Sequence, residues 1–385
     1  MERVKEALPI GAPKRLALGV GVVGLVALFA SGLLGTPGVV QSYLFAYTWW
    51  FALSVGAVGG LLLHHLLKSF WGRPIAPFME ASALTLPLLA ALFVPVLFGL
   101  QELYPWARPE AVAEDPILQH KAVYLNPGFF ALRFALYFAL WIGLTTLLVR
   151  LGRAHEPSRV QRRTELSAAG MVLFVFTASF AAVDLLMSLE PHFFSASFGA
   201  IFVEGHVLTA LAAAVAGAVL LAPKLPGLKS QLTPTNLQNL TNLLLVFLTV
   251  WAYLAFAQYL IIWGANLPAE AIYFVERSQG PWRGVSLALM GLQFALPFLL
   301  LLTNPPKRTP WVLGAIAAWL VLMRLVDVAW TVVPSLERVA ALTWTDLLAF
   351  LGVGGLWSWW FLGRLEERIQ AHALQEAPAE RGPEG

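Results

Sequence analysis

Ten apolar runs, each long enough to cross a lipid bilayer, limit what this chain can fold into. A helix needs about 20 predominantly apolar residues to span the hydrocarbon core, and Pro, Gly or charged residues bound each run. The runs lie at about 16–34, 45–67, 78–100, 128–149, 166–189, 196–222, 242–263, 285–302, 310–332 and 343–362. Charged residues make up only 12% of the 385 residues, about half the share of a water-soluble domain. The sequence therefore predicts an all-α, polytopic membrane protein with about ten transmembrane helices.

The distribution of Lys and Arg predicts the orientation of these helices. An even number of spans puts both termini on one side, and that side holds 18 Lys and Arg against 5 on the other. Cytoplasmic loops carry the excess of positive charge, so we expect both termini in the cytoplasm. The net charge of +3 follows from these inner loops and calls for no nucleic-acid partner.

Two further features of composition narrow the chemistry. The chain has no Cys, so it forms no disulfide and ligates no iron–sulfur cluster through thiolates. Any such centre must belong to a partner protein. The first apolar run follows a basic stretch, but it is too long for a secretion signal and no small-residue cleavage site follows it, so we expect a retained helix.

The chain divides into a membrane domain and two tails. We expect a basic cytoplasmic tail at 1–15, a ten-helix membrane domain at 16–363 and a cytoplasmic tail at 364–385, helical at first and then disordered.

An internal repeat divides the membrane domain. Val183-Asp184 is followed by Ser188 and Pro191, and Val326-Asp327 is followed by Thr331 and Pro334. The two copies close the fifth and ninth spans, which both run outward. This pattern predicts two four-helix bundles in parallel, 45–189 and 196–332, with peripheral helices beside them. Chance matching in an apolar background is the alternative.

Ionisable residues inside the spans are the candidate functional residues, because they are costly in lipid. A rise of about 1.5 Å per residue places one set in the outer half of the bilayer and a second set at its inner edge. The outer set is Arg133, Asp184, Glu204, His206, Arg324, Asp327 and Asp346; the inner set is His64, His65, Lys68 and Glu80. Arg324 and Asp327 are three residues apart and share one helix face.

The apolar band between the two sets leaves two interpretations open. The sets could form two aqueous half-channels for protons, separated by a hydrophobic gap, or two belts of polar pairs buried between helices. A bis-histidine heme is not predicted, because His64 and His206 differ in depth by about 13 Å and axial ligands must face each other. No metal site, phosphate-binding loop or serine-nucleophile motif is present in the sequence.

Four stretches resemble one known family. They are Trp71-Gly72-Arg73-Pro74 with Glu80 and Leu86-Pro87-Leu88-Leu89; Tyr124-Leu125-Asn126 with Phe129-Phe130 and Arg133; Ser188-Leu189-Glu190-Pro191-His192-Phe193-Phe194-Ser195; and Trp251-Ala252-Tyr253 through Gln258-Tyr259-Leu260-Ile261-Ile262-Trp263 with Asn266-Leu267-Pro268. With these motifs the chain resembles the F subunit of alternative complex III, a bacterial quinol-oxidising complex. That subunit belongs to the wider NrfD-like membrane subunits of polysulfide-reductase type. Phe193 and Phe198 stand where we expect Trp and Tyr, so two hydrogen-bond donors are lost there.

The resemblance implies a setting for the chain in the cell inner (cytoplasmic) membrane. It implies no redox cofactor bound by this chain, with quinol or menaquinol as the candidate ligand and with heme and iron–sulfur clusters on partner subunits. The implied partners are a homologous membrane subunit, a periplasmic iron–sulfur protein and multiheme cytochrome subunits. The candidates for binding quinone in this chain are Glu190, His192, Tyr253 and Tyr259.

The function that these inferences favour is that of a non-catalytic membrane subunit in a quinol:cytochrome c or quinol:electron-acceptor oxidoreductase. We expect proton conduction or energy coupling through Asp184, Glu204, His206, Arg324, Asp327 and Arg133 on the outer side and His64, His65 and Glu80 on the inner side. Two alternatives remain. A proton-coupled secondary transporter would move a solute when reconstituted alone, and a structural anchoring subunit would tolerate neutralisation of these groups.

Overall fold

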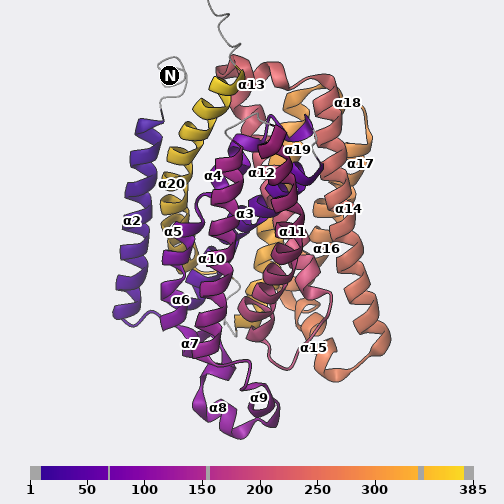
Figure 1. Ribbon diagram of the computed structural model, residues 1–385. Coiled ribbons are helices and arrows are strands. Elements are labelled where there is room, and N and C mark those ends of the chain that lie inside the picture. The colour runs from indigo at the N-terminus through magenta and orange to yellow at the C-terminus, as the bar shows by residue number, and fades with distance from the viewer. Residues whose placement is uncertain (1–9, 68–69, 153–156, 337–341, 377–385) are drawn as a thin grey trace, which may run out of the picture.

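Ten long apolar helices run up and down through the molecule (Figure 1). The computed structural model describes residues 10–67, 70–152, 157–336 and 342–376, and within these residues it contains helices and no strand. Each of the ten is long and apolar enough to cross a membrane. This confirms the prediction of an all-α, polytopic membrane protein. The orientation in the membrane stays a prediction.

Five of the ten spans are single helices, two are broken into shorter helices, and three are followed by a 3-10 turn. The single helices are α2 (Gly11–Leu33), α3 (Val39–Leu67), α10 (Pro127–Leu151), α14 (Pro234–Ala265) and α20 (Trp344–Glu376). The third span consists of α4 (Ala76–Ala83), α5 (Leu86–Leu92) and α6 (Val94–Phe98), and the eighth of α16 (Gly280–Ala288), the π-helix Leu289–Ala295 and α17 (Leu296–Leu302). The spans with a 3-10 turn are α11 (Pro157–Leu185), with its turn at Met187–Leu189, α12 (Phe198–Leu221) and α19 (Pro310–Val332). Short helices in the connections are α7 (Leu100–Leu103), α8 (Pro109–Glu114), α9 (Pro116–Lys121), α13 (Pro226–Gln231), α15 (Pro268–Arg277) and α18 (Pro305–Arg308).

Proline and polar caps explain many of these boundaries. Pro is the first residue of α10, α14 and α19, where its missing N–H would have had no helical partner. The side chains of Asn126 and Thr233 accept hydrogen bonds from the first turns of α10 and α14. In the third span the helix is interrupted just before Pro87 and Pro95, as expected where proline clashes with the preceding turn.

The centre of the bundle is the crossing of α3 and α12. These are the most deeply buried spans, with 72% and 67% of their apolar segments inside the protein. A Cβ atom added at Gly56 of α3 would lie 1.8 Å from the backbone oxygen of His206 on α12, so only glycine permits this close approach. Around the crossing, α3 also packs against α4, α11 and α20, and α12 against α11, α14 and α19. The division into two repeated four-helix units stays a prediction.

The first span lies at the edge of the molecule, against α20 (Figure 1). The two helices approach closely where glycines face each other, since a Cβ at Gly24 would lie 2.8 Å from the backbone nitrogen of Gly352. Helix α20 continues to Glu376, so the predicted tail at 364–385 begins as a helix, as expected.

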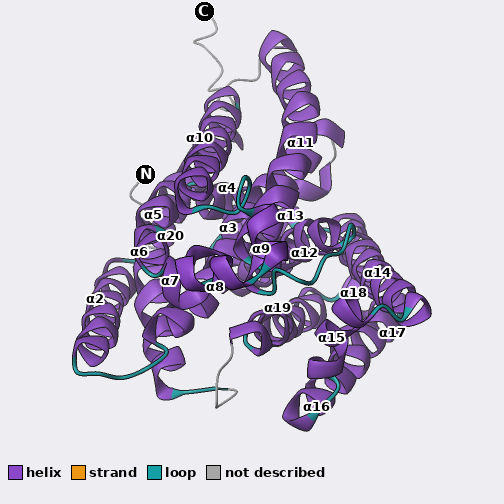
Figure 2. Cartoon of the chain, turned by 90° about the horizontal axis from the view of Figure 1, so that it is seen from below, coloured by secondary structure: helices purple, strands orange, loops and turns teal. Residues whose placement is uncertain are grey.

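The connection at 101–127, which the sequence predicts on the outer side, folds into α8 and α9, which protrude from one end of the bundle (Figure 1) and lie across its middle when seen from that end (Figure 2). The imidazole of His192 bonds the Asp115 carboxylate at 2.5 Å, and Lys121 donates to the backbone oxygen of Pro191 at 2.6 Å. The hydrogen bond from His192 lowers the pKa of Asp115. The connection is therefore tied to the turn that joins α11 to α12.

Candidate functional site

A cavity of about 640 Å³ lies in the second half of the membrane domain. It is enclosed by α12, α14, α15, α16 with the following π-helix, and α19. Most lining side chains are apolar or aromatic, and polar groups stand at distinct places among them: His206, Gln258, Tyr259, Arg277, Ser278, Arg283, Ser286, Arg324 and Asp327. Apolar walls with a few polar groups are typical of a binding site or water-filled path.

Two buried ionisable side chains of α12 have no hydrogen-bond partner among the described residues, and one of them, His206, lines the cavity. Both carboxylate oxygens of Glu204 and both ring nitrogens of His206 are buried and make no well-formed hydrogen bond in the described part of the chain. The His206 ring packs on Phe202, with ring centroids 3.7 Å apart. Buried polar groups nearly always have partners, so these two residues need an explanation other than stability.

The walls of the cavity carry further unpartnered polar atoms. The indole nitrogen of Trp251 and the amide oxygen of Gln258, both on α14, are buried and have no hydrogen-bond partner among the described residues. Both side chains line the cavity. The site thus presents a donor and an acceptor that a bound molecule or water could satisfy.

An ion pair between Arg324 and Asp327 lies beside these groups. The structure contains the contact that the three-residue spacing indicates, and Nε of Arg324 also donates to the Thr209 hydroxyl on α12 at 3.2 Å. A Cβ added at Gly205 would lie 2.2 Å from Nη2 of Arg324. The guanidinium therefore rests on the α12 backbone between Glu204 and His206.

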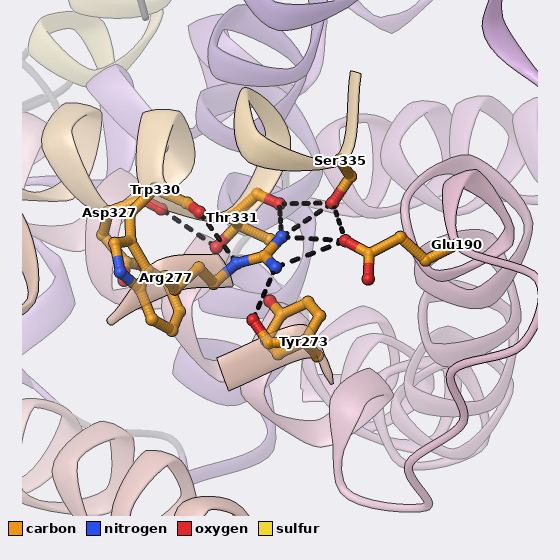
Figure 3. A network of polar contacts seen from close by, with 7 residues as sticks. All are labelled: Glu190, Tyr273, Arg277, Asp327, Trp330, Thr331 and Ser335. Carbon is orange, nitrogen blue, oxygen red and sulfur yellow. Dashed lines mark hydrogen bonds and ion pairs between the residues drawn. The ribbon is translucent and has the colours of Figure 1, made fainter. Parts of the chain in front are cut away.

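Arg277 lines the cavity and lies at the centre of a network of polar contacts (Figure 3). Its side chain is fully buried. Its guanidinium donates to the backbone oxygens of Trp330 at 3.1 Å and Thr331 at 2.9 Å and to the Glu190 carboxylate at 3.2 Å. It also lies over the Tyr273 ring, 3.5 Å from the centroid. Arg277 thereby joins α15, the turn after α11 and the end of α19.

Arg277 is not among the predicted site residues, because it lies between the seventh and eighth apolar runs, in a predicted outer loop. One feature of the sequence could have indicated this role for an arginine. The last backbone carbonyl groups of a helix, here at the end of the ninth span, lack helical partners and attract a cation. In the same network Ser335 donates to Glu190. Burial raises the pKa of Tyr273 to about 12, so its phenol keeps its proton at neutral pH.

Asp184 and Arg133 form a separate network. The guanidinium binds the carboxylate through two hydrogen bonds of 2.8 and 2.9 Å, and the Tyr137 hydroxyl donates to the same carboxylate at 3.0 Å. Arg133 also donates to the backbone oxygen of Tyr124. Asp184 is fully buried and does not line the cavity. The structure thus groups Glu204, His206, Arg324 and Asp327, and places Asp184 with Arg133 between α10 and α11.

The quinone-binding candidates occupy different surroundings. Tyr259 lines the cavity, and Glu190 is bound by Arg277. The side chain of His192 is 52% exposed, and Tyr253 is 68% exposed on the outer surface of α14. Of the four, Tyr259 alone lines the cavity.

The inner set is completed by residues of α20. The Glu80 carboxylate accepts hydrogen bonds from Arg368 at 2.5 Å and from His372 at 3.1 Å. The rings of His64 and His65 lie 4.9 Å apart, and Nδ1 of His64 is buried without a partner among the described residues. Arg368 and His372 were missed because the sequence analysis places them in the tail, although their four-residue spacing puts both on one helix face.

An apolar layer separates the two polar groups. Gly56 lies against His206, and His64 follows eight residues later on α3, which corresponds to about 12 Å along the helix. The side chains that meet α3 at Gly59 and Gly60, within this interval, are Phe174, Val207, Met79 and Leu211.

Neither a known family nor a curated relative identifies this site. Sequence comparisons find no matching protein family and no matching curated protein. Among the described residues, no group of three or more His, Asp or Glu side chains is placed to hold a metal ion.

Proposed function

We propose that this chain is an integral membrane subunit of a respiratory quinol-oxidising complex of the alternative complex III type, in which it conducts protons and its partners carry the electrons. The motifs given above and the ten-helix membrane fold support this proposal. The observation that carries it is a pair of buried groups, Glu204 and His206, which have no hydrogen-bond partner in the described part of the chain and lie beside the Arg324–Asp327 ion pair at the cavity.

These groups have the chemistry of a proton relay. A neutral imidazole accepts a proton at one nitrogen and donates one from the other, and a carboxyl group exchanges a proton at its oxygens. The role of Arg324 is to offset the charge of Asp327 and of an ionised Glu204. Ser278 and Ser286 also line the cavity, and in this proposal water reaches the relay past their hydroxyl groups.

The inner set forms the second half of the proposed path. Glu80, His372 and His64 lie at the other end of α3, and the apolar layer around Gly59 and Gly60 stands between the halves. An unbroken chain of polar groups would let protons leak down their gradient. A gap that closes only with a conformational change links proton transfer to a step elsewhere in the complex.

The same cavity fits the ring of a quinol as a second role. Its volume of about 640 Å³ is large enough for such a ring, since small-molecule sites span about 300–1,000 Å³. Phe256 and Tyr259 line it while remaining 61% and 43% exposed on the outside of α14, so the bilayer lies next to it. A photoreactive quinone analogue should then label α14 or the π-helix, and His206→Phe should reduce the labelling.

Purification from native membranes tests the proposed complex. An affinity-tagged chain extracted in mild detergent should bring with it a homologous membrane subunit, a periplasmic iron–sulfur protein and multiheme cytochromes. The secondary-transporter alternative instead predicts that the chain purifies alone and moves a solute across liposomes. That result would remove the chain from a respiratory complex.

A neutralised carboxyl group tests proton conduction. In the assembled complex in vesicles, Glu204→Gln keeps the side-chain shape and has no hydrogen bond to lose, so assembly and quinol oxidation should persist while protons moved per electron decrease. The matched control is Glu165→Gln on the exposed face of α11, which should leave the ratio unchanged. An unchanged ratio in Glu204→Gln would favour the structural anchoring role.

A further inference from the structure

A second cavity, of about 360 Å³, lies at the end of the bundle where Lys and Arg are concentrated. It is formed where the last turns of α10 meet α20 and the end of α4. Its charged lining residues are Arg150, Arg364, Arg368 and Glu367, and its other lining residues are Leu84, Thr146, Val149 and Ala371. The site is distinct from the large cavity, with which it shares no lining residue.

Some N–H groups of the arginines in this cavity make no hydrogen bond with the described residues. Arg368 is 3% exposed, and among described residues only its Nε has a hydrogen-bond acceptor, the Glu80 carboxylate. Arg364 donates to Glu367 through Nη1 at 2.9 Å. Arg150 is exposed, and its guanidinium makes no hydrogen bond with any described residue. The remaining guanidinium N–H groups are available to a ligand.

Charge and hydrogen bonding select the chemistry of that ligand. Three arginines and one glutamate line the cavity, and Glu80 offsets the charge of Arg368 from the protein side, so a positive charge is left without a partner. An arginine at the end of a membrane-spanning helix extends its guanidinium to the level of the lipid headgroups, where it attracts an anion. The planar guanidinium fork matches the oxygens of a phosphate group.

The apolar part of the lining selects the rest of the ligand. Leu84, Val149 and Ala371 border the cavity beside the arginines. On the neighbouring turn of α10, Leu147 is 48% exposed, so this helix presents an outward apolar face next to the site. We propose that the cavity binds the phosphate of an anionic phospholipid, whose acyl chains lie along α10. Basic pockets between helices at this end of a membrane protein are suited to such headgroups.

Native mass spectrometry of the purified protein, or of the complex that contains it, tests this site. Phosphatidylglycerol should be retained more strongly than phosphatidylcholine. Arg150→Gln should weaken retention about fivefold, the effect of one basic residue near a lipid surface, and it breaks no described hydrogen bond. Lys229→Gln, an exposed position on α13 at the same end, is the matched control and should retain the lipid as the unchanged protein does.

Further arms separate a lipid from a soluble ligand and protect the test against misfolding. Inorganic phosphate should not displace phosphatidylglycerol; displacement would mean that a free phosphate, and not a lipid, is the ligand. If Arg150→Gln fails to fold, Arg364→Gln measures the same loss. Equal retention of the two lipids, or equal weakening by Lys229→Gln, would overturn the proposal.

Discussion

Replacement of Asp184 by Asn should destabilise this protein strongly, because it leaves the guanidinium of Arg133 buried without a counter-charge. Asp184 is fully buried and Arg133 is 6% exposed, and the two side chains share two hydrogen bonds. Removal of one partner from a buried ion pair costs about 3–5 kcal/mol. The amide oxygen of Asn keeps one acceptor, so we expect the lower end of this range.

A double variant tests the physical origin of that loss. Arg133→Met alone leaves a buried carboxylate and should cost a similar amount. When both changes are combined no charge remains unpaired, so the double variant should be more stable than the sum of the single losses predicts, by about 2–3 kcal/mol. Tyr137→Phe removes one hydrogen bond to the carboxylate and should cost about 1.5–3 kcal/mol.

Equilibrium unfolding in mixed detergent, followed by tryptophan fluorescence, measures these free energies. Additive losses in the double variant would show that the two charges do not stabilise each other. A stable Asp184→Asn protein that no longer couples proton movement to quinol oxidation would contradict the structural role argued here and place Asp184 in the proton path.

Two smaller changes test other parts of the structure. Gly56→Ala should force α3 away from the backbone oxygen of His206, which would lie 1.8 Å from the added Cβ. In the same unfolding assay this change should cost about 1–3 kcal/mol or more. The control is Gly143→Ala, which has open space around it and should have no such effect. The hydrogen bond between His192 and Asp115 lowers the pKa of the Asp115 carboxyl group in the folded protein. This hydrogen bond therefore stabilises the connection that contains α8 and α9 fully at pH values above the unfolded pKa of about 3.9. The stabilisation is lost as the pH falls through the lower pKa that Asp115 has in the folded protein. A spin label on α9 should therefore become mobile only in acid, and Asp115→Asn should make it mobile at neutral pH; a label that is immobile in both cases would contradict this.

The fold followed from the sequence because the length of an apolar run is a local property. A segment of about 20 apolar residues crosses a bilayer as a helix whatever surrounds it, so the ten spans and their order could be predicted. The Arg324–Asp327 contact was also predictable, because both residues lie on one helix and three-residue spacing fixes their proximity.

Contacts between distant helices could not be predicted in this way. Glu190 and Arg277 are 87 residues apart, and Glu80 and Arg368 are 288 apart. Depth along a helix gave each residue a level in the membrane but not a direction around the helix axis. This is why Asp184 was grouped with Glu204 by depth, while the structure pairs it with Arg133.

Infrared difference spectroscopy of the assembled complex, recorded as quinol is added, would test most directly whether Glu204 carries a proton. We predict a change in a carboxyl carbonyl band that is present in the unchanged protein, absent in Glu204→Gln and retained in Glu165→Gln. A difference spectrum that is identical in the unchanged protein and in Glu204→Gln would show that this carboxyl group keeps one protonation state throughout and conducts no proton.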